Sequence, residues 1–243
     1  MNDRNIIRLG RAACAALALT AAAGCGDIKV KAEPKLPPAL VAPLPLTVGV
    51  YYGNNFRTYK HREERWGAGY EVDLGPGHLH LAEQLFRMEF TSTVPVESLD
   101  AVPQSAHLAA VVEPRIERYS FLTARDTGGQ YFAVTIDYRL NLFNTKGERI
   151  DSFTFVGYGS APSKGMGSTS PLEAATQSAM RDAAAKFLVQ FPVQVTVKKL
   201  LAGEAVAPLG ESSVASTGAE ETLGGIEMVP IVEKPAPKQP DLL

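Results

Sequence analysis

A long segment of alternating polarity, followed by a turn and a second apolar segment, constrains the fold of this 243-residue chain more than any other feature. Between 130 and 143 apolar residues occupy every second position, and 150–158 follows the turn sequence Asn-Thr-Lys-Gly at 144–147 as the returning partner. Alternation with a period of two is typical of strands that bury one face, and the glycine suits a tight turn. The sequence therefore predicts an antiparallel hairpin over 130–158.

The alternation also assigns a face to each side chain of this hairpin. One face is expected to be buried and the other to face water, because apolar residues alternate with mostly polar ones. The predicted buried face carries Phe132, Val134, Ile136, Tyr138, Leu140 and Leu142, and the opposite face carries Tyr131, Thr135, Asp137, Arg139 and Asn141.

The remaining elements follow from helical spacing and shorter alternating runs. Apolar residues recur every three or four positions over 78–90 and over 170–191, which predicts two helices. Strands are predicted over 44–52, 91–96, 109–119 and 193–197, and Pro114 indicates an edge position or a bulge. The predicted fold class is α+β, with two helices packed on one face of a mixed, mainly antiparallel sheet, a two-layer α/β sandwich.

The first 24 residues have the composition of an export signal. Arg4, Arg8 and Arg11 precede the apolar run 12–23, which is too short to span about 30 Å of hydrocarbon. The run ends in Ala22-Ala23-Gly24-Cys25, which resembles the lipobox of bacterial lipoproteins. That resemblance implies cleavage before Cys25, a diacylglyceryl group on its thiol and acylation of its new amine. The alternative is an ordinary secretory signal peptide with a chance cysteine near its end.

The same resemblance implies a location and a domain organisation. The residue after Cys25 is Gly26 and not Asp, which by similarity to enterobacterial sorting implies an outer-membrane anchor facing the periplasm. We expect a signal peptide at 1–24, a lipidated Pro-rich tether at 25–43 and a globular α/β domain at 44–202. The tail at 203–243, with seven acidic residues and two Lys, is predicted to be disordered.

Charge and cysteine content exclude several classes of function. The chain holds 24 Lys and Arg and 26 Asp and Glu; residues 1–24 contain three Arg and one Asp, which leaves a net charge of about −4 for the rest. Such a mild negative charge indicates no nucleic-acid partner. Cys14 leaves with the signal peptide and Cys25 carries lipid, so no thiol is left for a disulfide, a metal site or nucleophilic catalysis. No cofactor is predicted.

The domain resembles a group of envelope lipoproteins in the pattern of its elements. The strand at 46–52, the hairpin at 131–158 and the alanine-rich helix at 172–191 are similar to the TolB N-terminal domain, the curli-secretion lipoprotein and the penicillin-binding-protein activators. This resemblance implies a non-catalytic binding or assembly role for a transport or cell-wall machine, with an envelope protein, peptidoglycan or another glycan as partner. The alternative is a periplasmic enzyme acting on wall or surface glycans.

Local patterns give little support to chemistry. His78 and His80 could share a metal ion on one strand face, but they fall at a predicted helix start, where we expect them to diverge into solvent. The Gly/Ser-rich stretch 157–168 follows a strand and precedes a helix, yet Lys164 stands before Gly165 and breaks the phosphate-binding order. No metal site and no catalytic residue are predicted.

The candidate partner surface is the aromatic and basic stretch 52–70, which the sequence predicts to be a long connection. Long loops in compact domains are commonly functional, and rings beside arginines are enriched at binding hot spots. The candidate residues are Tyr52, Phe56, Arg57, Tyr59, Arg65 and Trp66. The alternative is that Tyr59 and Trp66 fold into the core.

The lipobox generates the first prediction. Mass spectrometry of the mature N-terminal peptide is expected to find Cys25 as the first residue, carrying a diacylglyceryl group and an acylated amine. Cys25→Ala is expected to leave the protein uncleaved or released from the membrane, because no acyl chains then hold it. An unmodified Cys25, or a mature chain that retains residues 1–24, would contradict the prediction.

Overall fold

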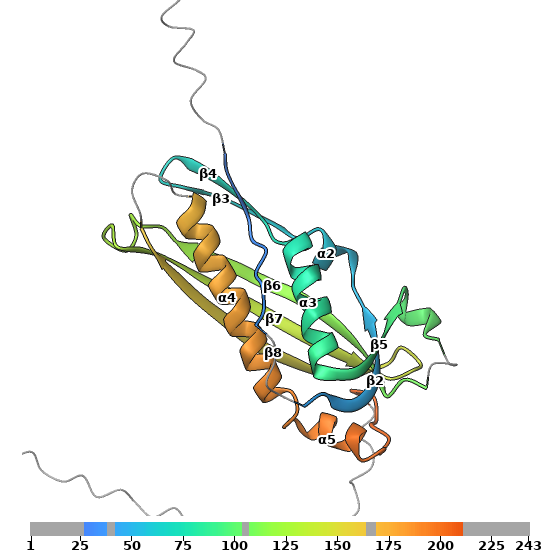
Figure 1. The fold of residues 1–243 in the computed structure, drawn as a ribbon. Coiled ribbons are helices and arrows are strands. Elements are labelled where there is room, and N and C mark those ends of the chain that lie inside the picture. The colour runs from blue at the N-terminus through green and yellow to red at the C-terminus, as the bar shows by residue number, and fades with distance from the viewer. Residues whose placement is uncertain (1–26, 38–41, 104–106, 164–168, 211–243) are drawn as a thin grey trace, which may run out of the picture.

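The computed structural model describes residues 27–37, 42–103, 107–163 and 169–210 (Figure 1). Within these ranges eight strands form a five-stranded sheet, in the order β5-β2-β6-β7-β8, and a three-stranded sheet, in the order β1-β4-β3. The strands are β1 Ile28–Lys31, β2 Leu44–Tyr51, β3 Lys60–Arg65, β4 Ala68–Asp73, β5 Phe90–Val96, β6 Ala110–Leu122, β7 Tyr131–Phe143 and β8 Arg149–Pro162. The α-helices are α2 Asn54–Arg57, α3 Gly75–Glu89, α4 Thr169–Gln190 and α5 Val195–Leu201, and η1 Leu99–Ala101 is a 3₁₀ turn.

The predicted hairpin is confirmed as β7 and β8. The two strands pair antiparallel along their whole length, from Tyr131 opposite Pro162 to Phe143 opposite Arg149. The turn is fixed by Asn144, whose side-chain oxygen accepts hydrogen bonds from the backbone N–H groups of Lys146 and Glu148. All six residues expected on the inner face of β7 are buried.

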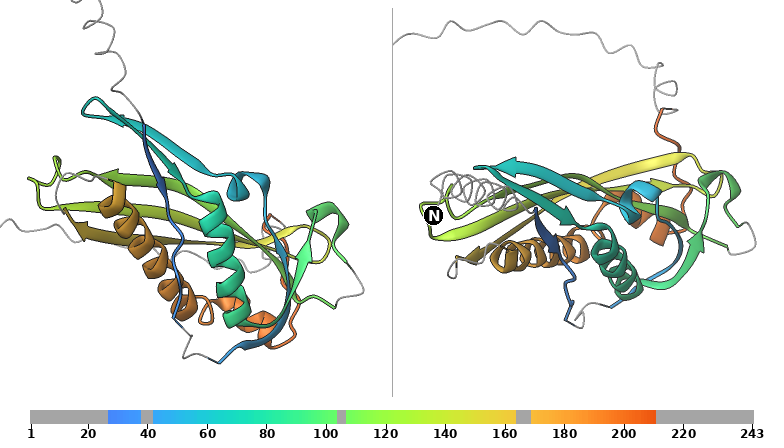
Figure 2. Two further views of the ribbon diagram at one scale, coloured as in Figure 1. Left: turned by 45° about the horizontal axis from the view of Figure 1, so that its top comes forward. Right: turned by 90° about the horizontal axis from the view of Figure 1, so that it is seen from above.

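The two long helices lie on one face of the five-stranded sheet, as predicted (Figures 1 and 2). Their apolar faces meet through aromatic rings that helical spacing places on one side. Phe86 of α3 and Phe187 of α4 pack edge to face with centroids 5.8 Å apart, and Phe187 reaches Phe155 of β8 at 6.0 Å. Rings of this size dominate the burial of apolar area between sheet and helices.

Helix α4 packs closely against the outer strand β8 because two glycines leave room for it. A side chain at Gly157 or Gly159 would overlap backbone atoms of α4 at Ala179 and Ala175. The close approach lets Asp182 accept a hydrogen bond from the N–H of Tyr158 at 2.8 Å, while Lys186 donates to the carbonyl of Val156 at 2.8 Å. These two side chains therefore occupy backbone groups on the free edge of β8, where another chain could otherwise pair.

The structure corrects the predicted fold class in its details. There are two sheets and four α-helices in the described residues, in place of two helices on one sheet. The five-stranded sheet is mixed: β2 runs parallel to both β5 and β6, while the long strands β6, β7 and β8 pair antiparallel. The predicted connection at 53–69 contains α2 and the strand β3. That strand has no apolar residue and is held to β4 by ion pairs such as Arg62–Glu71 at 2.8 Å, so its sequence lacks the usual alternation of a half-buried strand.

The start of the predicted tether belongs to the folded domain. Val30 and Ala32 are each 1% exposed, and β1 pairs parallel with β4 from Ile28 opposite Tyr70 to Lys31 opposite Asp73. The prediction of a tether over 25–43 is therefore wrong for the described residues 27–37. A period-two pattern of apolar residues runs through this segment, but the prolines that follow outweigh it in the sequence.

The C-terminal boundary also differs from prediction. The prediction of a strand at 193–197 is wrong: residues 193–194 lie in a turn and helix α5 begins at Val195. Val197 is buried, while Val193 and Val195 are exposed. Packing also continues past 202, where the N–H of Leu209 donates to the carbonyl of Arg149 at 2.8 Å. Cys25 and residues 211–243 lie outside the described residues. None of the described helices is long and apolar enough to cross a membrane.

The contact between α4 and β8 generates the second prediction. Gly159→Ala is expected to lower the free energy of unfolding by about 1–3 kcal/mol, because the new methyl group must push α4 away from the sheet. Chemical denaturation measures the change. Ser160→Ala is the control, since this neighbouring side chain on β8 is exposed. Equal stabilities of the two variants would contradict the packing described here.

Candidate functional site

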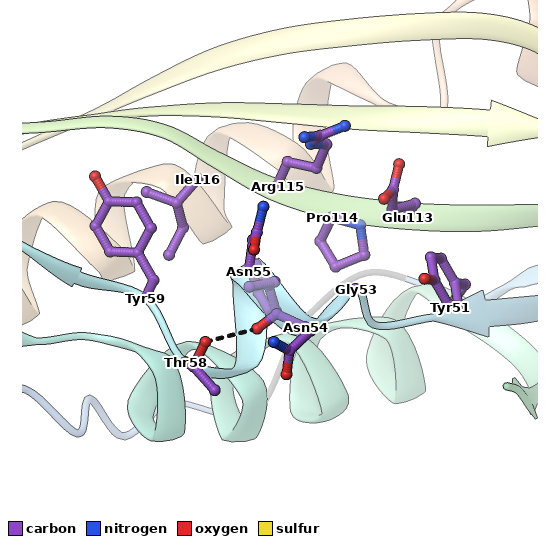
Figure 3. Close-up of a pocket in the computed structure, with 11 residues that line it drawn as sticks. Tyr51, Gly53, Asn54, Asn55, Thr58, Tyr59, Glu113, Pro114, Arg115 and Ile116 are labelled. Carbon is purple, nitrogen blue, oxygen red and sulfur yellow. Dashed lines mark hydrogen bonds between the residues drawn. The ribbon is translucent and has the colours of Figure 1, made fainter. Parts of the chain in front are cut away.

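A cleft opens where strand β2 leaves strand β6 (Figure 3). The ladder between them joins only Val48–Val50 to Ala110–Val112, after which the chain turns at Gly53 into α2. Strand β6 continues to Leu122, paired with β7 on its other side. Among the described strands none forms a ladder with β6 on the cleft side beyond Val112, so β6 presents an open edge to a cleft of about 520 Å³.

The cleft combines polar groups with aromatic rings at its two ends. Figure 3 shows Asn55 reaching from α2 toward β6, with Tyr59 and Ile116 at one end and Tyr51 and Glu113 at the other. The complete lining is Tyr51, Gly53, Asn54, Asn55, Phe56, Thr58, Tyr59, Glu113, Pro114, Arg115 and Ile116. Amide, guanidinium and carboxylate groups in one concave surface can orient a ligand by hydrogen bonds while the rings bury its apolar parts.

The position of Pro114 agrees with the sequence-based expectation of an edge or a bulge. Pro114 lies opposite Leu140 of β7, on the part of β6 that β2 no longer covers, and a bulge follows between Ile116 and Arg118. A proline offers no backbone donor, so it is tolerated best where a strand has a free edge. Sequence and structure therefore mark the same segment of β6 as an edge.

Four of the six candidate partner-surface residues lie near this cleft. Phe56 is buried and packs edge to face on His78, with centroids 6.1 Å apart. Tyr52 stacks on Phe56 at 6.0 Å, and burial raises the pKa of its hydroxyl. Arg57 is exposed, and its Nε donates to the carbonyl of Tyr52 at 2.9 Å. Tyr59 is half-buried in the cleft wall.

The other two candidates lie at the far end of strand β3. Trp66 and Gly67 form its two-residue turn into β4, with φ of 55° and 75°, which is the geometry of a type I′ hairpin turn. Trp66 is 59% exposed. Strand β3 has six residues, or about 20 Å, and separates this turn from the cleft. The structure thus distributes the candidate residues over two places and not over one continuous loop.

The turn is fastened to the loop between β6 and β7. The Nε1 of Trp66 donates to Oδ1 of Asp126 at 2.9 Å, and the guanidinium of Arg125 lies 4.4 Å from the centroid of the indole ring. Hydrogen bonds from the backbone and side chain of Thr123 hold the pKa of the Asp126 carboxyl below its usual value, so it remains charged beside Arg65. The alternative that Trp66 folds into the core is therefore wrong.

Two buried titratable groups lie outside the cleft, on the inner face of α3. His78 is 1% exposed, which corrects the expectation of a solvent-facing histidine, and burial lowers its pKa to about 4. Its Nδ1 donates to the carbonyl of Leu74 at 2.8 Å, so its Nε2 accepts from the hydroxyl of Tyr138 at 2.6 Å. Burial raises the pKa of Glu89 to about 7. His78 lies seven residues before Leu85 and Glu89 four residues after it, which places both on the apolar face of a helix. Sequence reasoning did not use this spacing.

The lining of the cleft offers few groups for acid–base or metal chemistry. Its lining includes one carboxylate, Glu113, which accepts a hydrogen bond from Asn141 at 2.7 Å, whereas most glycosidases use two. In the described parts of the chain no three His, Cys, Asp or Glu side chains are grouped to hold a metal ion.

Comparisons with known proteins leave the family open. No protein-family model and no curated protein match the sequence. Among solved structures, the chain is similar to a DUF330 family protein from Xanthomonas campestris, with 14% identity, a TM-score of 0.41 and coverage of 72% of this chain and 97% of that one. A protein described as a homolog of a neuraminyllactose-binding hemagglutinin from Helicobacter pylori has 11% identity, a TM-score of 0.43 and coverage of 70% and 96%.

A third similar structure belongs to a Caulobacter crescentus protein described as a lipoprotein. It is 16% identical, with a TM-score of 0.34 and coverage of 53% of this chain and 86% of that one. These identities and TM-scores are too low to transfer a function to this chain.

The contrast between Phe56 and Trp66 generates the third prediction. Phe56→Ala is expected to cost about 3–5 kcal/mol of unfolding free energy, because it empties a space beneath α2 and beside His78. Trp66→Ala is expected to cost about 1 kcal/mol, because an exposed ring loses one hydrogen bond and one cation–π contact. Chemical denaturation of both variants measures the difference, and equal losses would contradict these placements.

Proposed function

We propose that this chain is a lipid-anchored, non-catalytic binding protein of the bacterial cell envelope. The lipid on Cys25 holds it in the outer membrane, facing the periplasm, and the cleft beside β6 binds an extended segment of a partner protein. The observation that carries the proposal is the open edge of β6, which loses its neighbour β2 after Val112. The lipobox-like stretch before Cys25 supports the anchor.

An extended peptide fits this edge by adding a strand to the sheet. The backbone N–H and C=O groups on a free strand edge supply affinity that does not depend on sequence, while neighbouring side chains supply specificity. Here Asn55 and Arg115 are placed to form hydrogen bonds with polar groups of the peptide, and Tyr59 is placed to pack against an apolar side chain (Figure 3). The cleft volume of about 520 Å³ lies in the range of sites that enclose small ligands or short segments.

The other edges of the five-stranded sheet are less suited to strand addition. Backbone groups of β8 at Val156 and Tyr158 are already occupied by Lys186 and Asp182 of α4. Strand β5 at the opposite edge carries Pro95, and the open part of β6 carries Pro114, so proline content does not separate these two edges. The cleft side of β6 is favoured because its open edge faces a concave surface lined with polar groups and rings. No observation favours the alternative of an enzyme acting on glycans.

Site-specific photocrosslinking in cells tests the cleft and is the fourth prediction. A benzophenone amino acid at Asn55, which is exposed and reaches into the cleft, is expected to give a covalent adduct with a single partner protein. The same group at Thr154, an exposed position on β8, is the matched control and is expected to give none.

Peptide mass spectrometry of the adduct then identifies the segment bound, and hydrogen exchange measures its effect on β6. Exchange of the backbone amides of Glu113, Arg115 and Ile116 is expected to slow when the synthetic segment is added, because the new strand occupies the open edge. Adducts of equal yield at Asn55 and Thr154, or unchanged exchange in 113–116, would show that the cleft is not the recognition site.

A further inference from the structure

One end of the domain gathers the entry of the chain and two turns. Figures 1 and 2 show the start of β1, the turn between β3 and β4 and the loop between β6 and β7 at the same end of the molecule, with α5 at the other end. Asp27 is the first described residue, and Ile28 pairs with Tyr70 of β4. The start of β1 therefore lies beside β4 three residues after the turn residue Gly67.

The covalent chain limits how far this end can lie from an anchor at Cys25. Two residues of fully extended chain span about 7 Å, so Cys25 cannot be farther than that from Asp27, whatever path it takes. A flexible tether after Cys25 would allow the domain to lie far from the membrane. Residues 28–31 of the predicted tether instead form β1, which is paired with β4. An anchor at Cys25 therefore keeps this end of the domain against the lipid surface.

The same end exposes large apolar side chains. Trp66 is 59% exposed, Leu122 is 45% exposed and Tyr131 is 42% exposed. Leu122 and Tyr131 flank the loop 123–130, and that loop contacts Trp66 through Arg125 and Asp126. The β3–β4 turn and the β6–β7 loop, with the strand ends that carry Leu122 and Tyr131, are therefore joined at this end of the domain. Tryptophan and tyrosine are the residues enriched at membrane–water interfaces, where an apolar ring with one polar group fits best.

The indole ring of Trp66 can enter the lipid headgroup layer at little cost because its N–H group already has a hydrogen-bond acceptor. Its indole N–H is already satisfied by Asp126 at 2.9 Å, so moving the ring among lipid headgroups leaves no unpaired donor. Arg125, which is exposed and stacked on the ring, keeps its charge free to meet lipid phosphates. A ring held at the tip of a tight turn, with its polar atom paired inside the protein, is suited to contact with a bilayer.

We propose that this end, formed by Trp66, Leu122 and Tyr131, rests in the headgroup layer of the membrane that holds the lipid on Cys25. The inference rests on the proposed anchor and adds the orientation of the domain to it. Strand β3 then rises from the membrane, and the cleft at its other end stands about 20 Å above the turn. Partner proteins reach the open edge of β6 from the periplasmic side.

The fluorescence of Trp66 tests the orientation without any mutation, because it is the only tryptophan in the chain. The mature lipidated protein is reconstituted into vesicles of phosphatidylethanolamine and phosphatidylglycerol that carry brominated acyl chains. Trp66 is expected to be quenched by bromine near the headgroups more strongly than by bromine near the chain ends, and to be shielded from aqueous iodide. This is the fifth prediction.

A second variant provides a control at the opposite end. Trp66→Phe combined with Val195→Trp moves the probe to α5, at a position that is 69% exposed. Its emission is expected to be quenched by iodide and not by brominated lipid. Lipid quenching of equal strength at both positions would mean that the domain has no fixed orientation, and would overturn the proposal.

Flotation of the vesicles separates failure of the anchor from failure of the orientation. Protein that does not float with the vesicles lacks the anchor, and both proposals fall. Protein that floats while Trp66 is quenched by iodide and not by bromine has an anchor but a different membrane-facing side. Shielding of Trp66 from both quenchers would show that a protein surface, such as a second copy of this chain, covers it in place of lipid, and would also overturn the orientation.

Discussion

The short ladder between β2 and β6 is the constraint on which the rest of the structure depends. Only three residue pairs join these strands, from Val48 opposite Ala110 to Val50 opposite Val112. Because β6 continues for ten residues after that, paired with β7 on one side, its other side needs a different neighbour or stays open. The chain leaving β2 supplies α2 and the hairpin of β3 and β4, which cover part of this side and leave the cleft between α2 and β6.

The two proposals use opposite ends of the hairpin that results. At one end of β3, Tyr59 lines the cleft, whose other lining residues supply amide, guanidinium and carboxylate groups. At the other end, Trp66 lies on the turn that is fastened to Asp126 and Arg125. A rigid strand between them, stiffened by ion pairs to β4 such as Lys60–Asp73 at 3.3 Å, fixes the distance between the membrane contact and the binding site. Anchoring and recognition would therefore be geometrically coupled in this domain.

Sequence reasoning succeeded where burial follows a simple period. The hairpin of β7 and β8 and the helices α3 and α4 carry long apolar stripes, so their positions and buried faces could be predicted. It failed for β3, whose charged side chains form ion pairs with β4, and for α5, because Val193, Val195 and Val197 alternate as in a strand across its start. It also missed the burial of His78, which donates to the carbonyl of Leu74 just before the same helix and accepts from Tyr138, 60 residues away.

The sequence by itself determined the two-layer core, the types of side chain in the stretch 52–70 and the cysteine to which a lipid is proposed to be attached. Pro114 also indicated an edge or a bulge near its position. Only the tertiary structure decided that β1 is part of the core, which removes the tether, and over which residues β6 has an open edge. The physical reason is that both features depend on pairing between distant segments: Val30 is buried because β4 and α4 lie beside it, and the edge of β6 is open because β2 turns away at Gly53. No local pattern of residues records where a neighbouring strand ends.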